Sequence, residues 1–401
     1  METYITYRTA SQLPDTVEGE PEDMPLTTLA EYVTLLADSD ASRALIRGNE
    51  PLLHPEFQDF TARLAEHNIP PVIETTGLAG TDALGGLSGR DFEMILKLYH
   101  PDAYPADNIG TAIRTGREVP EPARRKLHLS LVIDDPTRDY GFVRELLPEL
   151  RPVSVKIKLA CPLPREKAKL LSKWMVKELP DMARQGLGVQ LDCALRPCAF
   201  SDAGWGRLAK MGINPDRCVP HPGVRPDGRI YHCTRMINDP AGQLADFDTR
   251  SQVVGYLYER YGNWQNRVDI TPGCRECDML RAGSCVGECL VLKGRAMQRQ
   301  IDEYEEQEFS DMTVEDIARL AGLYLAMQRA DKAERWLVAA RQRYPEAGPV
   351  HLMLARVLRA RDRTAEAREE YKKASRLIPG EPRIRAEMEQ MLSELGKKNT
   401  G

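Results

Sequence analysis

The sequence lacks three features that would each point to a broad class of function. It has no run of apolar residues long enough to span a membrane. Its formal charge of −5, with 29% charged and 6% aromatic residues, provides no basic, aromatic stripe for a phosphate backbone. Its first residues, METYITYRTASQLPD, contain no basic, apolar leader. We therefore expect a soluble, cytoplasmic protein that binds neither membranes nor nucleic acid.

Cysteine is also missing from a large part of the chain. Residues 1–160 contain none, and the rest of the chain contains nine. In a reducing cytosol these thiols are candidates for metal binding or catalysis rather than for disulfides. Seven of the nine lie between Cys198 and Cys289, in a stretch that is rich in turns. We therefore predict that residues 198–295 form a small domain stabilised by a metal.

Residues 1–197 alternate between short β-rich runs and amphipathic segments. This alternation predicts βαβ units and a parallel sheet, either open or closed into part of a barrel. In such folds, ligands bind at the carboxyl ends of the strands. The predicted strands are residues 4–9, 44–48, 70–76, 92–99, 127–134, 153–160 and 188–194, and the clearest helical patterns are residues 26–39, 55–68 and 165–179.

Residues 311–395 contain a repeat with a period of 34 residues. Seven positions recur with the same small, large or proline character; they are Leu320, Ala321, Tyr324, Ala333, Leu337, Ala340 and Pro345, followed by Leu354, Ala355, Leu358, Ala367, Tyr371, Ala374 and Pro379. The period and residue classes resemble the tetratricopeptide repeat, whose grooves take peptide segments. We expect a capping helix over residues 382–395, an acidic helical linker over residues 296–310, and a protein or peptide partner. The simpler alternative is an ordinary helical hairpin domain.

Four cysteines form a dense group with the spacing C-x2-C-x7-C-x3-C, namely Cys274, Cys277, Cys285 and Cys289. Thiolates are soft ligands that suit zinc or an iron–sulfur cluster, and the spacing does not distinguish the two. Upstream, a C-x9-G-x4-C pattern joins Cys218 to Cys233 through the turn residues RPDG. This pattern predicts a hairpin that brings both thiols to one end.

Together these motifs resemble a known family. The two cysteine patterns resemble the auxiliary-cluster domain called SPASM, which follows the partial (β/α)6, TIM-like barrel of radical S-adenosylmethionine enzymes. The turn GNEP, formed by Gly48, Asn49, Glu50 and Pro51, resembles the family's GGEP turn, and Thr75 lies in a strand end, ETTG, that flanks the same cofactor. Over residues 1–295 the resemblance implies this fold and a pocket for S-adenosylmethionine.

The chain departs from the family at the motif on which catalysis depends. The family holds a [4Fe–4S] cluster with three cysteines, spaced C-x3-C-x2-C, after the first strand. Here the corresponding residues include Thr9, Ala10, Ser11 and Gln12, and none of them is a soft ligand. The GNEP turn then has two interpretations, which are retained cofactor binding or a purely structural role as a helix cap and strand turn.

A second departure concerns the auxiliary clusters, because no cysteine follows Cys289. In the family, one cluster uses the hairpin pair and the last of the four close cysteines. By resemblance, Cys218, Cys233 and Cys289 would hold that cluster, with Cys198 as a possible fourth ligand. The close cysteines would then hold an incomplete cluster, or all four would bind one zinc. His221 and His232 bracket the hairpin and can support a metal or face solvent.

The resemblance and its departures lead to three hypotheses. The first is a degenerate relative without catalytic residues, which keeps an auxiliary [4Fe–4S] cluster and acts as an accessory component that docks a partner. The second is an active S-adenosylmethionine-dependent enzyme with a cluster built from Cys161, Cys193 and Cys198. The third is a scaffold whose cysteine domain is stapled by zinc.

Overall fold

The computed structural model describes most of the chain and divides it into two compact units. The described residues are 1–9, 12–17, 22–39, 41–80, 82–105, 108–121, 123–159, 165–192, 197–213, 221–265, 274, 277–282, 285 and 289–398. The first unit takes the described residues up to Val291, and the second takes those from Leu292 onward. No helix among the described residues is long and apolar enough to cross a membrane.

The first unit is built on one ten-stranded sheet with the order β10-β9-β8-β1-β2-β3-β4-β5-β6-β7. Strands β1 to β7 run parallel, β8 is parallel to β1, and β8, β9 and β10 pair antiparallel. The seven predicted strands are confirmed, and β10 and β7 form the two edges of the described sheet. The strands are β1 Glu2–Tyr4, β2 Ala44–Arg47, β3 Pro71–Thr75, β4 Glu93–Leu98, β5 Leu127–Ile133, β6 Ser154–Leu159, β7 Gly188–Leu191, β8 Gly223–Val224, β9 Arg229–Tyr231 and β10 Gly242–Gln243.

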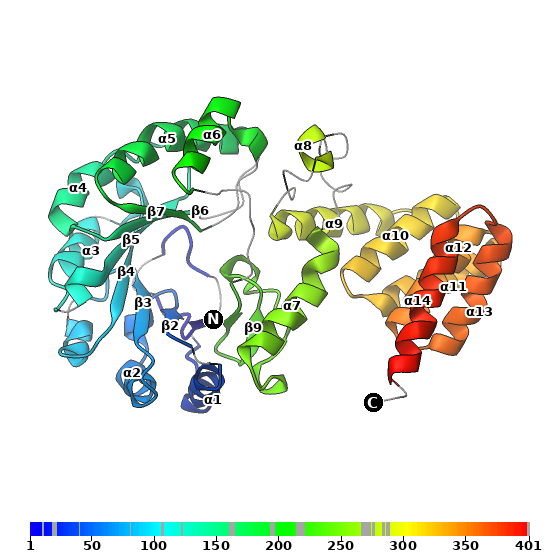
Figure 1. Ribbon diagram of the computed structural model, residues 1–401, viewed down its shortest axis with the longest axis horizontal. Coiled ribbons are helices and arrows are strands. Elements are labelled where there is room, and N and C mark those ends of the chain that lie inside the picture. Colours follow the sequence, from blue (N-terminus) through cyan, green and yellow to red (C-terminus); the bar gives the residue numbers. More distant parts are fainter. Residues whose placement is uncertain are drawn as a thin grey trace. The chain divides into compact units, whose positions relative to one another are not determined.

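Helices connect the parallel strands and cover the outer face of the curved sheet (Figure 1). The three clearest predicted helices are confirmed as α1, α2 and α5, whereas the β3–β4 connection contains a 3-10 helix, Asp82–Leu87. The helices of this unit are α1 Leu26–Ala37, α2 Phe57–Glu66, α3 Asn108–Arg117, α4 Val143–Leu150, α5 Arg165–Arg184, α6 Asp202–Lys210, α7 Arg250–Gln265 and α8 Asp278–Arg281.

The two faces of the sheet differ in polarity because neighbouring residues of a strand point to opposite sides. In β4, Met94, Leu96 and Leu98 alternate with Glu93 and Lys97, and all five are buried. The same alternation places Arg47, Glu74, Ser130 and Lys158 of the neighbouring strands in buried positions between apolar residues. We call the face that carries Arg47, Glu74, Lys97 and Lys158 the inner face.

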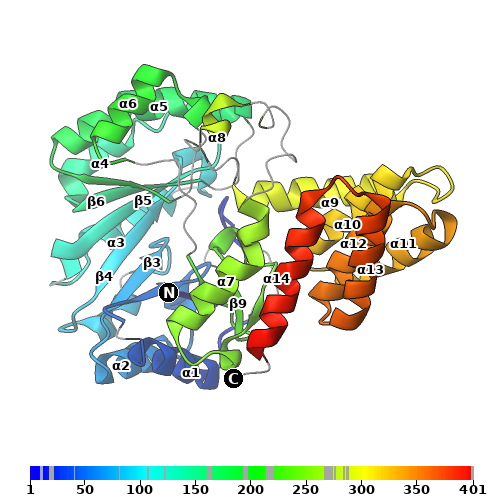
Figure 2. The ribbon, with the colours of Figure 1, turned by 45° about the vertical axis from the view of Figure 1, so that its right-hand side comes forward.

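The hairpin predicted around RPDG is confirmed between β8 and β9. The N–H of Gly228 donates to the carbonyl of Arg225 at 3.0 Å, and the N–H of Arg225 donates to the carbonyl of Arg229 at 2.9 Å. Gly228 has a φ of +76°, a conformation that favours glycine. Helix α7 runs beside this hairpin (Figure 2), and the hydroxyl of Tyr256 donates to the carbonyl of Ala241 at 2.7 Å.

The second unit consists of helices, and its two central helix pairs follow the predicted period. Helix α10 begins at Val314 and α12 at Gly348, while α11 begins at Ala330 and α13 at Thr364, so each partner starts 34 residues later. The recurring small and large residues identified in the sequence are buried in this unit. Its helices are α9 Leu290–Glu305, α10 Val314–Ala326, α11 Ala330–Arg343, α12 Gly348–Ala360, α13 Thr364–Leu377 and α14 Pro382–Lys398.

Candidate functional site at the ends of the parallel strands

The GNEP turn follows β2 and contacts the segment that follows β1. The N–H of Asn49 donates to the carbonyl of Thr6 at 3.1 Å, and the N–H of Glu50 donates to the carbonyl of Arg8 at 3.0 Å. A Cβ atom on Gly48 would lie 3.0 Å from the carbonyl oxygen of Thr6, so this close approach favours glycine. The turn therefore joins the ends of two neighbouring parallel strands.

Glu50 is fully buried and directs its carboxylate toward the end of β3. Its Oε1 accepts from the hydroxyl of Thr75 at 2.7 Å and from the N–H of Leu52 at 3.3 Å. Its Oε2 accepts from the N–H of Thr76 at 3.1 Å and also from the Thr76 hydroxyl. A carboxylate offers about four acceptor positions, and here donors of the chain itself occupy four. The arrangement favours the structural interpretation of the turn, because it leaves no acceptor position for the amino group of a ligand.

Asn49 fastens the residues that follow β1, and we call residues 12–17 the Asp15 loop. The Nδ2 of Asn49 donates to the carbonyl of Val17 at 3.0 Å and to the carbonyl of Tyr7 at 2.7 Å. Its Oδ1 accepts from the N–H of Val17 at 2.8 Å and from the Tyr4 hydroxyl. The side chain thus pairs with Val17 through both backbone groups, much as a neighbouring strand would.

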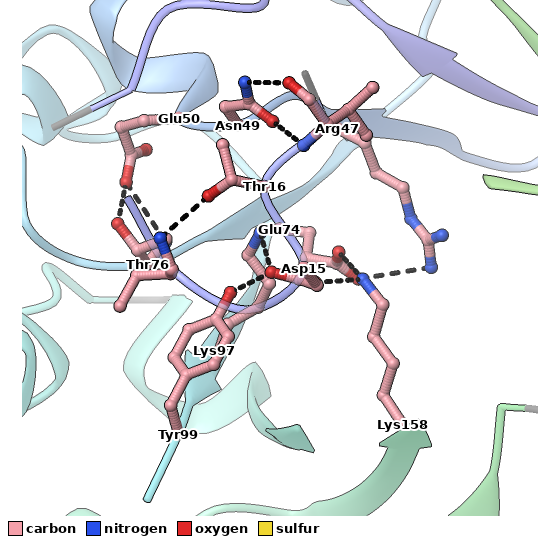
Figure 3. A network of polar contacts seen from close by, with 12 residues as sticks. Asp15, Thr16, Arg47, Asn49, Glu50, Glu74, Thr76, Lys97, Tyr99 and Lys158 are labelled. Carbon is pink, nitrogen blue, oxygen red and sulfur yellow. Dashed lines mark hydrogen bonds and ion pairs between the residues drawn. The ribbon is translucent and has the colours of Figure 1, made fainter. Parts of the chain in front are cut away.

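The Asp15 loop places a carboxylate against the inner face of the sheet (Figure 3). Asp15 Oδ2 lies 2.9 Å from Lys158 Nζ, and its Oδ1 lies 3.7 Å from Lys97 Nζ. The Tyr99 hydroxyl also donates to Oδ1. The side chains of Asp15, Lys97 and Lys158 are each at most 5% exposed, so this cluster of charges is removed from solvent.

Glu74 extends this cluster to β2 and to the segment after β9. Its carboxylate lies 3.0 Å from Lys158 Nζ and 3.1 Å from a terminal nitrogen of Arg47. The other terminal nitrogen of Arg47 lies 2.9 Å from Glu2 and donates to the Thr234 hydroxyl at 2.6 Å. Buried ion pairs of this kind need several partners to offset the loss of hydration, and each group here has at least two.

The charges of the cluster shift the pKa values of its members. Burial by itself would raise the pKa of Glu74, but the neighbouring cations Arg47 and Lys158 lower it to about 2. Burial likewise opposes ionisation of Asp15, and Lys158 and Lys97 hold its pKa well below the ordinary value. Burial lowers the pKa of Lys158, and the carboxylates of Asp15 and Glu74 raise it above the ordinary value. These three groups are therefore charged at neutral pH.

The residues after β1 do not fit the cluster-binding loop of the family that the sequence resembles. A three-thiolate site needs three cysteines, and residues 1–160 contain none. Thr9 and Gln12 belong to the described part of this segment, and the nearby Asp15 points toward lysines. Hard oxygen ligands paired with ammonium groups do not suit iron–sulfur chemistry.

The predicted cysteine ligands are only partly covered by the structure. Cys198, Cys233, Cys274, Cys277, Cys285 and Cys289 are each half-buried. Cys161, Cys193 and Cys218 lie outside the described residues. Within the described ranges, no three His, Cys, Asp or Glu side chains gather closely enough to hold a metal ion.

His232 precedes the predicted ligand Cys233 and is 1% exposed, so of its two interpretations the solvent-facing one is wrong. Its Nδ1 is buried and has no hydrogen-bond partner in the structure, while its ring packs edge-on against Tyr261 at a centroid distance of 5.1 Å. An unpaired, buried imidazole nitrogen suits a metal ligand. The surroundings of Cys233 are therefore compatible with a metal.

Comparison with known proteins supports the fold. No family model matches the chain, and no curated protein matches it either. Among solved structures, anSMEcpe with bound AdoMet and the Cp18Cys peptide has a TM-score of 0.51 and 14% identity, over 72% of this chain and 88% of that one. Streptococcus suis SuiB bound to S-adenosylmethionine has a TM-score of 0.51 and 12% identity, over 73% and 72%. The chain therefore has the fold of radical S-adenosylmethionine enzymes.

The sequence motifs drew attention to the GNEP turn and the cysteines but missed the charged inner face. Its signal is present in strand sequences such as EMILKL and SVKIKL, where single charged residues interrupt apolar runs. A charged residue at every second position of a buried strand indicates a polar interior. Asp15, by contrast, lies in a loop whose sequence carries no comparable signal.

Proposed function

We propose that this chain is a non-initiating relative of the radical S-adenosylmethionine enzymes and works as a binding or accessory component. In this proposal the barrel does not cleave S-adenosylmethionine. The cysteine-rich segment holds a metal centre, either an auxiliary [4Fe–4S] cluster or zinc. The helical repeats, which resemble tetratricopeptide repeats, dock a protein or peptide partner.

The observation that carries the proposal is the Asp15 loop. In the position where the family places its cluster ligands, this chain has a loop fastened by Asn49 and paired through Asp15 with Lys97 and Lys158. The same region contains Glu50 with four internal donors. Both arrangements are stable without a ligand, because every charged group already has partners of opposite charge or hydrogen-bond donors.

Two features support a metal in the cysteine-rich segment. The spacing of the four close cysteines suits soft metals, and the buried Nδ1 of His232 lies one residue from Cys233. If bound, an iron–sulfur cluster would supply electron transfer, and zinc would supply structural stability. His232 and the cysteines, with Cys218 and Cys198 among them, are the candidate ligands.

Partner docking rests on the helical repeats and on the peptide-bound relative. The second unit repeats its helix pairs at 34 residues, and stacked pairs of this kind present extended binding surfaces. The solved structure of anSMEcpe contains a bound peptide, Cp18Cys. A peptide or protein segment is therefore the class of partner that we propose for this chain.

The deciding experiment measures cleavage of S-adenosylmethionine. The protein is purified anaerobically, its iron and sulfide are reconstituted, and 5′-deoxyadenosine is quantified after addition of a strong reductant. We expect no product above the enzyme-free control, because the thiolates that would hold the initiating cluster are absent from residues 1–160. Turnover well above that control would overturn the proposal.

A second measurement tests the metal centre independently of cleavage. Iron, sulfide and zinc are quantified per chain in the unmodified protein and in the variants Cys233→Ala and Cys289→Ala. We expect both variants to lose much of the metal and some stability, because metal binding contributes to the folding of small, loop-rich segments. If both keep their full metal content while Cys161→Ala or Cys193→Ala loses it, the metal lies elsewhere.

The alternative function is an active S-adenosylmethionine-dependent enzyme with a cluster that includes Cys198. The observation in its favour is that ionisable side chains converge where parallel sheets bind ligands. The cleavage assay distinguishes the two functions, since only the enzyme would form 5′-deoxyadenosine.

A further inference from the structure

A cavity of about 480 Å³ lies in the second unit, where α11, α12 and α13 meet. This volume is typical of pockets for small ligands, which span about 300–1,000 Å³. Its lining is mainly charged rather than apolar; the residues are Arg341, Pro345, Glu346, His351, Lys373, Arg376 and Leu377. The cavity is far in sequence from the GNEP turn and the cysteines, so it is a separate feature of the chain.

Glu370 organises the cations of this cavity from a buried position on α13. Its Oε1 lies 2.9 Å from Arg341 and 3.2 Å from Lys373, and its Oε2 lies 2.5 Å from Nδ1 of His351. Burial opposes ionisation of Glu370, but hydrogen bonds from His351 and Lys373 lower its pKa overall. A single carboxylate thus holds the donors of three residues around one space.

His351 is 3% exposed and contacts an oxygen atom on each side of its ring. Its Nε2 lies 2.8 Å from the carbonyl oxygen of Pro345, while its Nδ1 faces Glu370. Both nitrogens can donate only when the ring carries two protons, so the fully hydrogen-bonded form of His351 is the cation. This form adds positive charge to the cavity.

The charges around the cavity do not cancel. Arg341, Lys373 and Arg376 provide three positive charges against two negative charges from Glu346 and Glu370, before His351 is counted. Arg376 makes no ion pair within the described residues, and its Nε donates only to the carbonyl of Lys372 at 3.4 Å. The terminal nitrogens of Arg376 therefore remain available to an anion, which would restore the balance.

The backbone beside the cavity is closely packed, so its shape is well defined. A Cβ atom on Gly348, the first residue of α12, would lie 2.3 Å from Cγ1 of Ile378 and 3.2 Å from Cβ of Leu377. Glycine at this position lets the start of α12 approach the end of α13. This close approach brings His351 toward Lys373 and Arg376.

From these observations we propose that the cavity binds an oxyanion, either a phosphate group or a carboxylate, through Arg376, Lys373 and Arg341. Guanidinium groups match such anions because their parallel N–H donors face two oxygens at once. The site does not depend on the docking function proposed above, since it can take a free small anion or an anionic group of a larger ligand.

The test is isothermal titration calorimetry on the full-length protein at constant ionic strength. Inorganic phosphate and acetate are titrated separately, with chloride as the balancing anion. The variant Arg376→Gln removes one cation at an exposed position, so the fold is retained, and Lys373→Gln removes a second. The matched control is Arg368→Gln, an exposed arginine on the same helix but outside the lining.

We expect saturable binding that Arg376→Gln weakens at least tenfold and Arg368→Gln leaves within twofold. Binding of phosphate alone assigns the site to phosphate groups, whereas binding of both anions assigns it to carboxylates as well. No binding of either anion overturns the proposal. Equal weakening by Arg376→Gln and Arg368→Gln also overturns it, because that result indicates diffuse attraction to the positive surface.

Discussion

At the scale of single residues, Asp15 defines how this chain differs from the enzymes whose fold it shares. Its carboxylate occupies the space between Lys97 and Lys158, where both ammonium groups are at least 95% buried. Without Asp15, Lys97 would have no ion-pair partner among the described residues, and Lys158 would keep only Glu74. The fold therefore depends on a loop residue to neutralise its own inner face.

This dependence predicts a large effect of Asp15→Asn on stability. The substitution keeps the shape of the side chain but leaves buried ammonium groups without full compensation, which costs about 3–5 kcal/mol of unfolding free energy. Urea denaturation measures the change. The control Asp102→Asn, whose side chain is 74% exposed, should change stability by less than about 0.5 kcal/mol. A loss below about 1 kcal/mol for Asp15→Asn would contradict the network.

The lowered pKa of Glu74 predicts a dependence of stability on pH. Its pKa is about 2 in the folded protein against an ordinary value of 4.5, so the folded state favours the ionised form. The resulting stability, about 3 kcal/mol, is fully present above about pH 5 and is lost as the pH falls toward 2.

Urea denaturation between pH 6 and pH 2 tests this dependence. The variant Glu74→Gln should show a decline about 3 kcal/mol smaller than that of the unmodified protein, because Gln does not titrate. Asp15 contributes a further decline in both proteins, since its pKa is lowered as well. The exposed Glu121→Gln should behave like the unmodified protein, and identical curves for all three would disprove the role of Glu74.

Sequence patterns predict part of the site at this scale. Gly48, Glu50 and Thr75 were recognisable because a turn at the end of a strand has a characteristic residue order, and the structure brings these three together. The role of Asp15 was not predictable, because it depends on contacts with strands that lie more than 80 residues away. Metal binding by the cysteines remains a prediction.

At the scale of elements, the seven parallel strands were predictable because their apolar, β-branched runs are bounded by polar turns. Helices α3 and α4 were missed for physical reasons. Helix α3 contains Gly110 and Gly116, and α4 contains Pro148, so local propensity argues against both. Tertiary packing of Ala112, Val143 and Leu147, all buried, compensates for this.

The Asp15 loop is the element whose position is most open to a direct test. Its Val17 amide donates to Asn49, so Asn49→Ala removes this bond and two bonds that Asn49 donates to backbone carbonyls. Loss of buried hydrogen bonds costs about 1–3 kcal/mol locally, which predicts hydrogen exchange at Val17 at least tenfold faster.

Hydrogen exchange of residues 12–17, followed by mass spectrometry, provides the measurement. Exchange in β5 should remain unchanged, because its bonds do not involve the loop. Asn238→Ala, at an exposed position, serves as the control. If Asn49→Ala leaves the loop as protected as before, Asn49 does not fasten it.

At the scale of the whole molecule, composition and period predicted different things. The 34-residue period indicated helix pairs in the C-terminal region, because recurring small residues allow close helix packing, and the helices follow that period. Charge and cysteine count indicated a class of site but not its occupant. The ligand of a polar cavity depends on residues from several helices, and the anion site around Arg376 was therefore not visible in the sequence.

The division into two units predicts independent unfolding. Each unit has its own buried core, with Leu129 and Ile157 in the first and Leu337 and Leu354 in the second. Scanning calorimetry of the full chain should therefore show two transitions, and a chain that ends at Lys293 should keep only the first, at the same temperature and with the same metal content per chain. A shift of that transition by more than about 4 °C, or precipitation of the shortened chain, would mean that the helical unit supports the barrel. In that case the repeats serve the stability of the fold, and the proposal that they dock a partner fails.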